Sequence, residues 1–160
     1  MARSTAADAP AGAYLVIDGR RWRATDPSIP EALRVELVGE LMTARRVIDR
    51  PRVHDAKVAL GERGPKWWED PTAEGDEERL AATIRALVRH RGPEATICPS
   101  DAARAAGGAR WRSLMGRARE VARKLAVEGA IDVVQRGRRV DSTQPWKGPV
   151  RLRLRAPDPG

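Results

Sequence analysis

Residues 111–123 read WRSLMGRAREVAR, and this stretch decides how the C-terminal half of the chain is expected to fold. At helical spacing, Arg112, Arg119 and Arg123 fall on one row of the surface. The apolar side chains fall on a separate stripe, which would face a core. That stripe comprises Trp111, Leu114, Met115, Ala118, Val121, Ala122 and Leu125. The pattern predicts a helix from about Arg110 to Glu128 whose guanidinium row is either an ordinary solvated face or a surface for phosphate and base edges.

The residues that follow this helix predict a β-hairpin and a third strand. In AIDVVQRGRRVD (130–141), strand-like runs flank Arg136-Gly137, and a turn at this pair places Val133 opposite Val140. Arg136, Arg138 and Arg139 then lie at the hairpin tip. PVRLRLR (149–155) alternates strictly, so its apolar side chains are expected to face inward and its arginines outward.

The residues before the helix complete a recognisable order of elements. DEERLAATIRALVRHRG (76–92) predicts a helix with acids at its start and bases at its end, as the helix dipole favours. A short apolar stretch at 96–98 follows, then a brief helix capped by Ser100 that ends at Gly107-Gly108. Helix, short strand, helix, helix and hairpin is the order of a winged helix, in which the third helix enters a groove and the wing tip contacts the backbone.

The N-terminal half predicts a smaller hairpin and two helices. YLVIDGRRWR (14–23) carries Asp18-Gly19, a pair typical of a two-residue hairpin turn, which places Leu15 opposite Trp22 and favours partial burial of this tryptophan. One helix follows with Leu33, Leu37, Leu41, Ala44 and Ile48 on one face, ends at Pro51, and is followed by a shorter one. Trp67 and Trp68 either close this N-terminal core or line a partner surface.

We therefore expect an α+β protein with two folded parts. Residues 1–12 form a predicted disordered tail, and residues 13–70 the N-terminal hairpin with its two helices. Residues 71–77 are acidic and turn-rich, and are typical of a linker or of the start of a helix. Residues 78–156 form the predicted winged-helix domain.

The positive charge of the chain is concentrated in its C-terminal half. The net charge is +8, yet residues 1–74 hold 12 Lys/Arg and 12 Asp/Glu, whereas residues 75–160 hold 18 and 10. Codon usage explains why the cations are mostly arginine, but it does not explain why they gather in one half. Such a one-sided field attracts polyanions.

Two stretches of the chain also resemble a known family. ICPSDAARAAGGARWRSLMGRAREVARKLAVEGAIDVVQRGRRVD (97–141) is similar to small bacterial proteins with a winged-helix-like domain of unknown function. GRRWRATDPSIPEALRVELVGELMTARR (19–46) and AKVALGERGPKWWE (56–69) resemble a companion segment found with that domain. The resemblance implies a fold and no activity.

The leading hypothesis is a nucleic-acid-binding protein, with DNA favoured over RNA and with a transcription regulator among the roles considered. Arg112, Arg119 and Arg123 would face the major groove, and Arg136, Arg138 and Arg139 would hold phosphates. Ribosomal or structured RNA is a variant of this hypothesis. The alternative is a protein-docking module that uses the winged helix and the Trp67-Trp68 surface.

The residues that could carry other chemistry favour structural roles. Cys98 precedes Pro99 in an apolar stretch and suits a buried thiol, while His54 and His90 have no triad or ligand spacing. We therefore expect no enzyme, metal or cofactor. The lone cysteine and the short longest apolar run, AYLVI, favour a cytoplasmic protein without membrane contact. The oligomeric state is left open.

Overall fold

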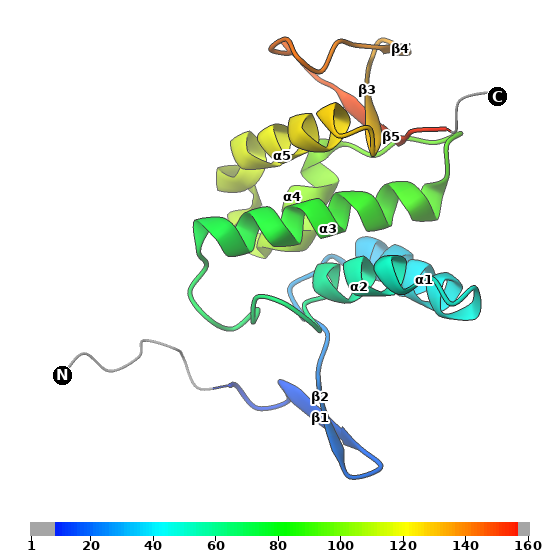
Figure 1. The fold of residues 1–160 in the computed structure, drawn as a ribbon. Coiled ribbons are helices and arrows are strands. Elements are labelled where there is room, and N and C mark those ends of the chain that lie inside the picture. Colours follow the sequence, from blue (N-terminus) through cyan, green and yellow to red (C-terminus); the bar gives the residue numbers. More distant parts are fainter. Residues whose placement is uncertain (1–8, 157–160) are drawn as a thin grey trace.

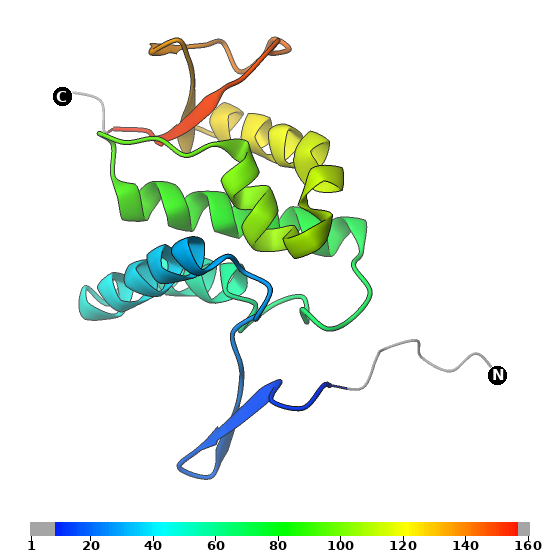
Figure 2. The same ribbon diagram turned by 180° about the vertical axis from the view of Figure 1, so that it is seen from behind.

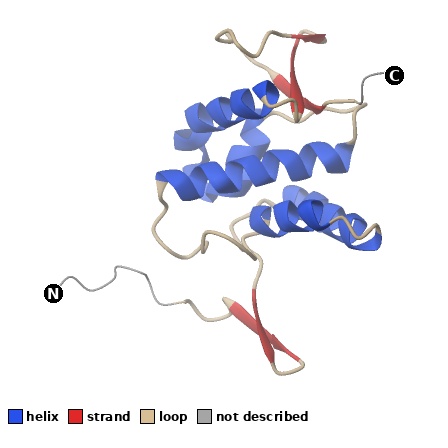
Figure 3. Cartoon of the chain, viewed as in Figure 1, coloured by secondary structure: helices blue, strands red, loops and turns tan. Residues whose placement is uncertain are grey.

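The computed structural model describes residues 9–156, so residues 1–8 of the predicted tail lie outside the described part of the chain. The fold is α+β, as predicted, with an N-terminal hairpin, a helical body and a three-stranded sheet (Figures 1 and 3). The helix α3 (Ala73–Arg91) runs through the middle. The helices α1 (Glu31–Arg46) and α2 (Arg50–Ala59) lie on one side of it, and α4 (Pro99–Gly107) and α5 (Met115–Val127) lie on the other. The hairpin and the three-stranded sheet lie at opposite ends, which the view from behind also shows (Figure 2).

The N-terminal hairpin pairs β1 (Tyr14–Ile17) with β2 (Arg20–Arg23) in the predicted register, with Leu15 opposite Trp22. Asp18 and Gly19 both adopt a positive φ, 51° and 75°, as a primed two-residue turn requires. Trp22 is partly buried, with 37% of the residue exposed, and does not belong to the core. The hairpin projects from the helical body (Figure 1), and Lys57, on the second helix, lies 5.0 Å from the centre of the Trp22 ring, which covers the ring only in part.

The helices α1 (Glu31–Arg46) and α2 (Arg50–Ala59) meet at a tight turn that the sequence pattern misplaced. Ile48, expected on the buried face of the first helix, lies beyond its end, with φ 55° and 79% exposure. Asp49 caps α2 by accepting a hydrogen bond from the Arg52 N–H, and Pro51 stands in the first turn of α2. Pro51 therefore begins the second helix, because proline needs no donor there.

The acidic stretch at 71–77 is the start of a helix from Ala73 onward, which was one of its two interpretations. The Thr72 hydroxyl accepts a hydrogen bond from the Gly75 N–H and caps α3, with Glu74 and Asp76 in the first turn. Basic residues end α3, which suits the helix dipole. One hydrophobic cluster includes residues of α1, α2, α3, α4 and α5, and the predicted core positions of α3 lie in it: Leu80, Ile84, Leu87 and Val88.

After α3 the chain forms a single bridge between Ile97 and Leu152, followed by α4 (Pro99–Gly107). Cys98 rather than Ser100 stands at the N-cap, and the Asp101 carboxylate accepts a hydrogen bond from the Cys98 N–H. The predicted single helix 110–128 is two elements, the 3₁₀-helix η1 (Gly108–Leu114) and the α-helix α5 (Met115–Val127).

The reason for this division is the sharp return of the chain after α4. Gly108 adopts φ 56°, and the backbone at Gly107 approaches Leu114 so closely that a Cβ there would lie 2.6 Å from its Cδ1. Only after this return does the chain continue as a regular α-helix. The expected buried stripe holds over α5, where Ala118, Val121 and Leu125 are buried.

The three-stranded sheet has the order β4 (Arg138–Arg139), β3 (Ile131–Gln135), β5 (Arg151–Leu154). Arg136 and Gly137 form the predicted turn with φ 52° and 77°, and the Val140 N–H donates to the Val133 carbonyl at 2.9 Å, which confirms the register. Leu152 is fully buried, as its alternation predicts. The order of elements is the predicted one, and its assignment as a winged helix stays a prediction.

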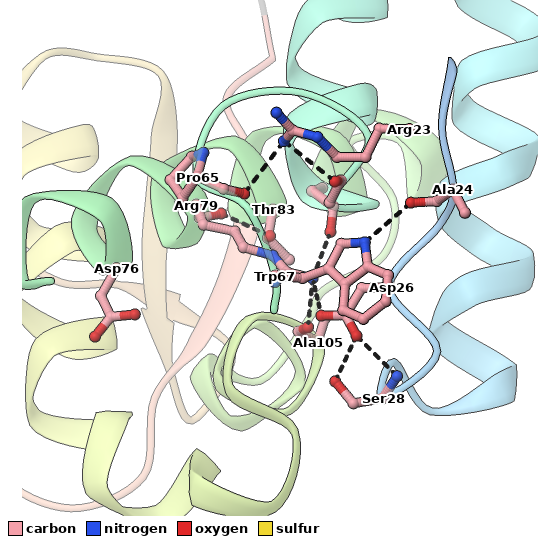
Figure 4. A network of polar contacts seen from close by, with 12 residues as sticks. Arg23, Ala24, Asp26, Ser28, Pro65, Trp67, Asp76, Arg79, Thr83 and Ala105 are labelled. Atoms are coloured by element: carbon pink, nitrogen blue, oxygen red, sulfur yellow. Dashed lines mark hydrogen bonds and ion pairs between the residues drawn. The ribbon is translucent and has the colours of Figure 1, made fainter. Parts of the chain in front are cut away.

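A buried polar network joins the two halves (Figure 4). Arg79 of α3 pairs with Asp26 at 2.8 Å, and the two side chains are only 8% and 6% exposed. The same Arg79 nitrogen, Nη2, donates to the carbonyls of Ala59 and Ala105, near the C-terminal ends of α2 and α4, at 3.3 Å each. Asp26 also accepts hydrogen bonds from the Ser28 N–H and hydroxyl. Arg79 therefore holds three separate segments together.

Candidate nucleic-acid interface

The six arginines singled out in the sequence lie on η1, α5 and the hairpin of β3 and β4. Arg112 belongs to η1 and is exposed, whereas Arg119 and Arg123 lie one turn apart on α5 and are half-buried. Arg136, Arg138 and Arg139 are exposed at the hairpin tip. The split of the predicted helix thus places Arg112 on a different element from the other two members of its row.

Arg112 lies on an aromatic face together with an arginine that the sequence did not single out. Its guanidinium carbon is 4.6 Å from the centre of the Trp111 ring system, and that of Arg104, on α4, is 4.5 Å away. Both arginines are exposed and Trp111 is half-buried. A guanidinium over an indole is attracted by the ring and keeps N–H groups free for other acceptors. The arrangement therefore orients two cations without neutralising them.

Arg119 and Arg123 face the long loop between β4 and β5. Their guanidinium carbons lie 5.8 and 5.6 Å from the ring of Trp146, and Arg119 Nη2 donates to the carbonyls of Trp146 and Gly148 at 3.2 Å each. Arg119 therefore fixes this loop against α5. Arg123 has the ring contact without those hydrogen bonds.

The hairpin tip borders an open hollow of about 1010 Å³. Its lining carries five cations and no carboxylate: Arg136, Arg138, Arg139, Lys147 and Arg151. The Gln135 amide donates to the Lys147 and Pro149 carbonyls and holds the loop beside the sheet. A concave surface with cations and no acid is suited to an anionic group.

Ion pairing separates these cations from most other arginines of the molecule. Within residues 9–156, Arg151 has no carboxylate oxygen within 4.0 Å but donates hydrogen bonds to Thr96. Six further arginines of this region also have no carboxylate oxygen within 4.0 Å, namely Arg104, Arg112, Arg119, Arg123, Arg136 and Arg138. We call these six residues the basic surface. Arg139 differs from them, since its guanidinium lies 3.7 Å from Asp132, to which Arg153 and Arg155 also pair.

Two carboxylates lie near the basic surface. Glu120 is exposed on α5. Asp141, in the loop after β4, accepts hydrogen bonds from the Thr143 hydroxyl and N–H, and these bonds hold the pKa of its carboxyl below its ordinary value. Asp141 is thus a charged turn residue.

Sequence reasoning missed Arg104, Trp146, Lys147 and Arg151 as members of this region. Arg104 is on another helix, and Trp146 and Lys147 follow a stretch of irregular loop, so neither periodicity nor alternation points to them. Arg151 was read only as an outward residue of the last strand. A signal did exist for Trp146, because PWKG (145–148) combines an aromatic residue, a cation and turn residues between two strands.

The second predicted surface, Trp67-Trp68, contributes to internal contacts. The two indoles meet edge to face with centroids 5.1 Å apart, and Trp68 meets Tyr14 of the hairpin at 5.4 Å. Trp67 Nε1 donates to the Ala24 carbonyl at 3.1 Å. Both tryptophans are half-buried. They therefore anchor the hairpin to the helical body, and their role as a partner surface stays a prediction.

The remaining candidate residues lie apart from one another. His54 is exposed beside Arg63, with 3.2 Å between its Nδ1 and an arginine nitrogen. His90 is exposed near the end of α3, and Cys98 is half-buried at the cap of α4. Among residues 9–156, no three His, Cys, Asp or Glu side chains gather as a metal ion would require. In the same part of the chain no helix is both long and apolar enough to span a membrane.

Comparison with known proteins relates the C-terminal half to a family. No curated protein matches the chain. A family model described as a protein of unknown function (DUF3253) matches residues 77–155, which extend from the first turns of α3 to just past β5 and include the whole basic surface. Residues 77–155 of this chain are therefore similar to the DUF3253 family.

Proposed function

We propose that this protein binds nucleic acid, and duplex DNA in preference to RNA, through the basic surface. The observation that carries the proposal is the absence of ion pairs at six arginines gathered on η1, α4, α5 and the hairpin tip, within residues 9–156. An arginine with no local carboxylate keeps its charge available for phosphate, and its planar fork matches phosphate geometry.

The order of elements supports the same function. In a winged helix, the third helix of the domain enters the major groove and the hairpin contacts the phosphate backbone. In this proposal η1 and α5 take the place of that helix, and the turn at Arg136-Gly137 forms the tip of the wing; the order of the elements supports it. We accordingly assign base and groove contacts to Arg112 and Arg123, and phosphate contacts to Arg136 and Arg138.

Arg119 has a different role in this proposal. Its hydrogen bonds to the Trp146 and Gly148 carbonyls hold the wing loop at a fixed distance from α5. Helix and wing must engage the same duplex together, so a fixed spacing reduces the entropy that binding would otherwise lose. Arg119 is therefore a positioning residue that also adds positive charge.

The test is a titration of fluorescent duplex DNA at about 50 and 200 mM salt. If about six phosphates are neutralised, the logarithm of the affinity falls with the logarithm of salt at a slope near −5. The variant Arg112→Ala/Arg136→Ala/Arg138→Ala removes three cations of the basic surface. We expect a loss of affinity of at least 30-fold at the lower salt concentration and a shallower slope.

The matched control is Arg34→Ala/Arg85→Ala/Lys124→Ala, which removes the same charge from cations that each have a carboxylate partner. Equal affinity loss in both variants would mean that net charge alone drives binding, and would overturn the assignment to the basic surface. Tighter binding to duplex RNA than to duplex DNA would overturn the preference for DNA. Absence of binding to either would overturn the function.

A further inference from the structure

A second group of unpaired cations lies in the N-terminal half, although that half is neutral by composition. Three carboxylates of this half form ion pairs with arginines of α3, a helix of the other half. The pairs are Asp26–Arg79, Asp55–Arg89 at 2.6 Å and Glu36–Arg91 at 2.7 Å. These pairs use three of the acids that balance the N-terminal charge. The cations of the hairpin and α2 are left without them.

Five of these cations gather where the hairpin approaches the helices α1 and α2. The Arg20 guanidinium and the Lys57 ammonium lie 4.4 and 5.0 Å from the centre of the exposed Trp22 ring. Arg45, Arg50 and Arg63 line a hollow of about 360 Å³ together with Ile48 and Val53, and no carboxylate lines it. We call Arg20, Arg45, Arg50, Lys57 and Arg63 the second cationic cluster.

The members of the cluster lie close enough to affect one another electrostatically. Partial burial lowers the pKa of Lys57 from its ordinary value, and the positive charges of Arg63, Arg45 and Arg20 lower it further, against an opposing effect of Glu62. The Glu62 carboxylate also accepts a hydrogen bond from the Thr25 hydroxyl. None of the five cations has a carboxylate oxygen within 4.0 Å among the described residues. Their mutual repulsion would be relieved by a bound anion.

The position of the cluster excludes it from the interface already described. It lies on the hairpin, the end of α1, α2 and the turn after α2, whereas the wing lies at the other end of the molecule with α3 between them (Figures 1 and 2). A duplex that contacts α5 and the wing therefore leaves the second cationic cluster free. The cluster is also spread over several elements around a shallow hollow, which suits an extended polyanion better than a small ion.

We propose that the second cationic cluster binds the phosphate backbone of a second nucleic-acid duplex, so that one molecule bridges two duplex segments. This inference rests on the proposed function of the basic surface, since bridging requires both surfaces. Trp22, held between Arg20 and Lys57, provides an exposed apolar surface at the centre of the contact. Arg45, Lys57 and Arg63 hold phosphates on either side of the α1–α2 turn.

The experiment is a capture assay in which one duplex is fixed to beads and a fluorescent duplex is recovered only when protein joins the two. The variant Arg45→Ala/Lys57→Ala/Arg63→Ala removes cations of the second cluster that have no carboxylate partner among the described residues, and the Arg34/Arg85/Lys124 alanine variant is again the matched control. We expect the cluster variant to bind a single duplex within threefold of wild type and to lose at least tenfold of the captured fluorescence. The control variant should capture as wild type does.

Each outcome decides between the two proposals. The proposal of a second site is wrong if the wild-type protein binds one duplex but captures no second one. It is also wrong if the cluster variant captures as much duplex as the wild type, which is the result expected if bridging arises from self-association. Neither outcome affects the proposal for the basic surface. The Arg112/Arg136/Arg138 alanine variant provides the separate arm. This variant is expected to keep some residual duplex binding. If that binding disappears when the cluster substitutions are added, the second site is supported even if the proposal for the basic surface fails. If the residual binding persists, the second site is overturned.

Discussion

The arginines of α3 and those of the basic surface are the same residue in opposite environments. Arg79, Arg89 and Arg91 each reach a carboxylate from another element, at 2.6 to 2.8 Å, and join α3 to the N-terminal segments. Arg112, Arg136 and Arg138 reach none and are exposed. The difference teaches that the availability of an acid from elsewhere in the fold, and not the local density of arginine, decides whether a cation holds the protein together or remains available to a ligand.

The largest expected effect comes from breaking the buried pair. Asp26→Ala leaves the Arg79 charge buried with only carbonyl partners, and removal of one member of such a pair costs about 3–5 kcal/mol of unfolding free energy. Arg136 is exposed and has no ion pair among the described residues, so Arg136→Ala should change the unfolding free energy by no more than about 0.5 kcal/mol. Urea unfolding of both variants measures the two values. Similar losses in the two would contradict the division into paired and unpaired arginines.

A smaller loss of stability is expected from substitution of Asp132, a carboxylate that pairs both with packed arginines and with an exposed arginine of the hairpin tip. This carboxylate is 8% exposed and pairs with Arg155 at 2.8 Å and with Arg139 and Arg153 at 3.7 Å. Asp132→Asn should lower the unfolding free energy by about 1–3 kcal/mol, because the packed arginines lose their acceptor. The same change releases Arg139 at the tip of the β3–β4 hairpin, so if the proposed function holds, affinity for duplex DNA should rise by about two- to fivefold at low salt.

The two readouts of this variant must move in opposite directions. They are measured on one preparation, by urea unfolding and by the fluorescence titration. A variant that loses both stability and affinity would mean that Arg139 has to be held by Asp132 in order to contact phosphate. Arg139 would then belong with the paired arginines.

The pair Glu36–Arg91 predicts an acid-sensitive contribution to stability. Hydrogen bonds from Arg91 lower the pKa of Glu36 in the folded protein, so the unfolded chain binds its proton more readily. The stabilisation is fully present above the ordinary pKa of glutamate and is lost as pH falls through the lowered value. At neutral pH we expect Glu36→Gln to reduce the unfolding free energy by about 1 kcal/mol, and this difference should shrink and disappear as pH falls through the lowered pKa of Glu36. A difference that is constant across this range would exclude ionisation as its cause.

Local patterns in the sequence were sufficient for the elements whose residues interact with near neighbours. Asp18-Gly19 and Arg136-Gly137 fixed both hairpin turns, and alternation placed Leu152 in the core. The periodicity of residues 111–125 gave the buried face of α5 but not the change to a 3₁₀-helix at η1. That change depends on the close approach of Gly107 and Leu114 after a reversal of the chain.

The pairing of charges could not be predicted, because it depends on contacts between residues distant in sequence. Arg91 and Glu36 are 55 residues apart, and Arg89 and Asp55 are 34 apart. Composition therefore described the N-terminal half as neutral, although three of its acids pair with α3 and the five cations of the second cationic cluster have no carboxylate partner among the described residues. The stacking of Arg119 and Arg123 on Trp146 was missed for the same reason, since the tryptophan lies in an irregular loop more than twenty residues away.

The smallest effect distinguishes two neighbours on the basic surface. Arg119→Lys should lower the unfolding free energy by about 0.5–1.5 kcal/mol, because lysine cannot reproduce the planar donor geometry toward the Trp146 and Gly148 carbonyls. Arg123→Lys, which retains a cation near the same ring, should change it by less than about 0.5 kcal/mol. If Arg119 acts by positioning the wing, Arg119→Lys weakens duplex binding while the slope with salt stays near the wild-type value, because the charge is kept. A shallower slope in Arg119→Lys would instead mean that the wing has detached from the duplex together with its phosphate contacts, and that the loop carbonyls set how many cations the protein can bring to one duplex.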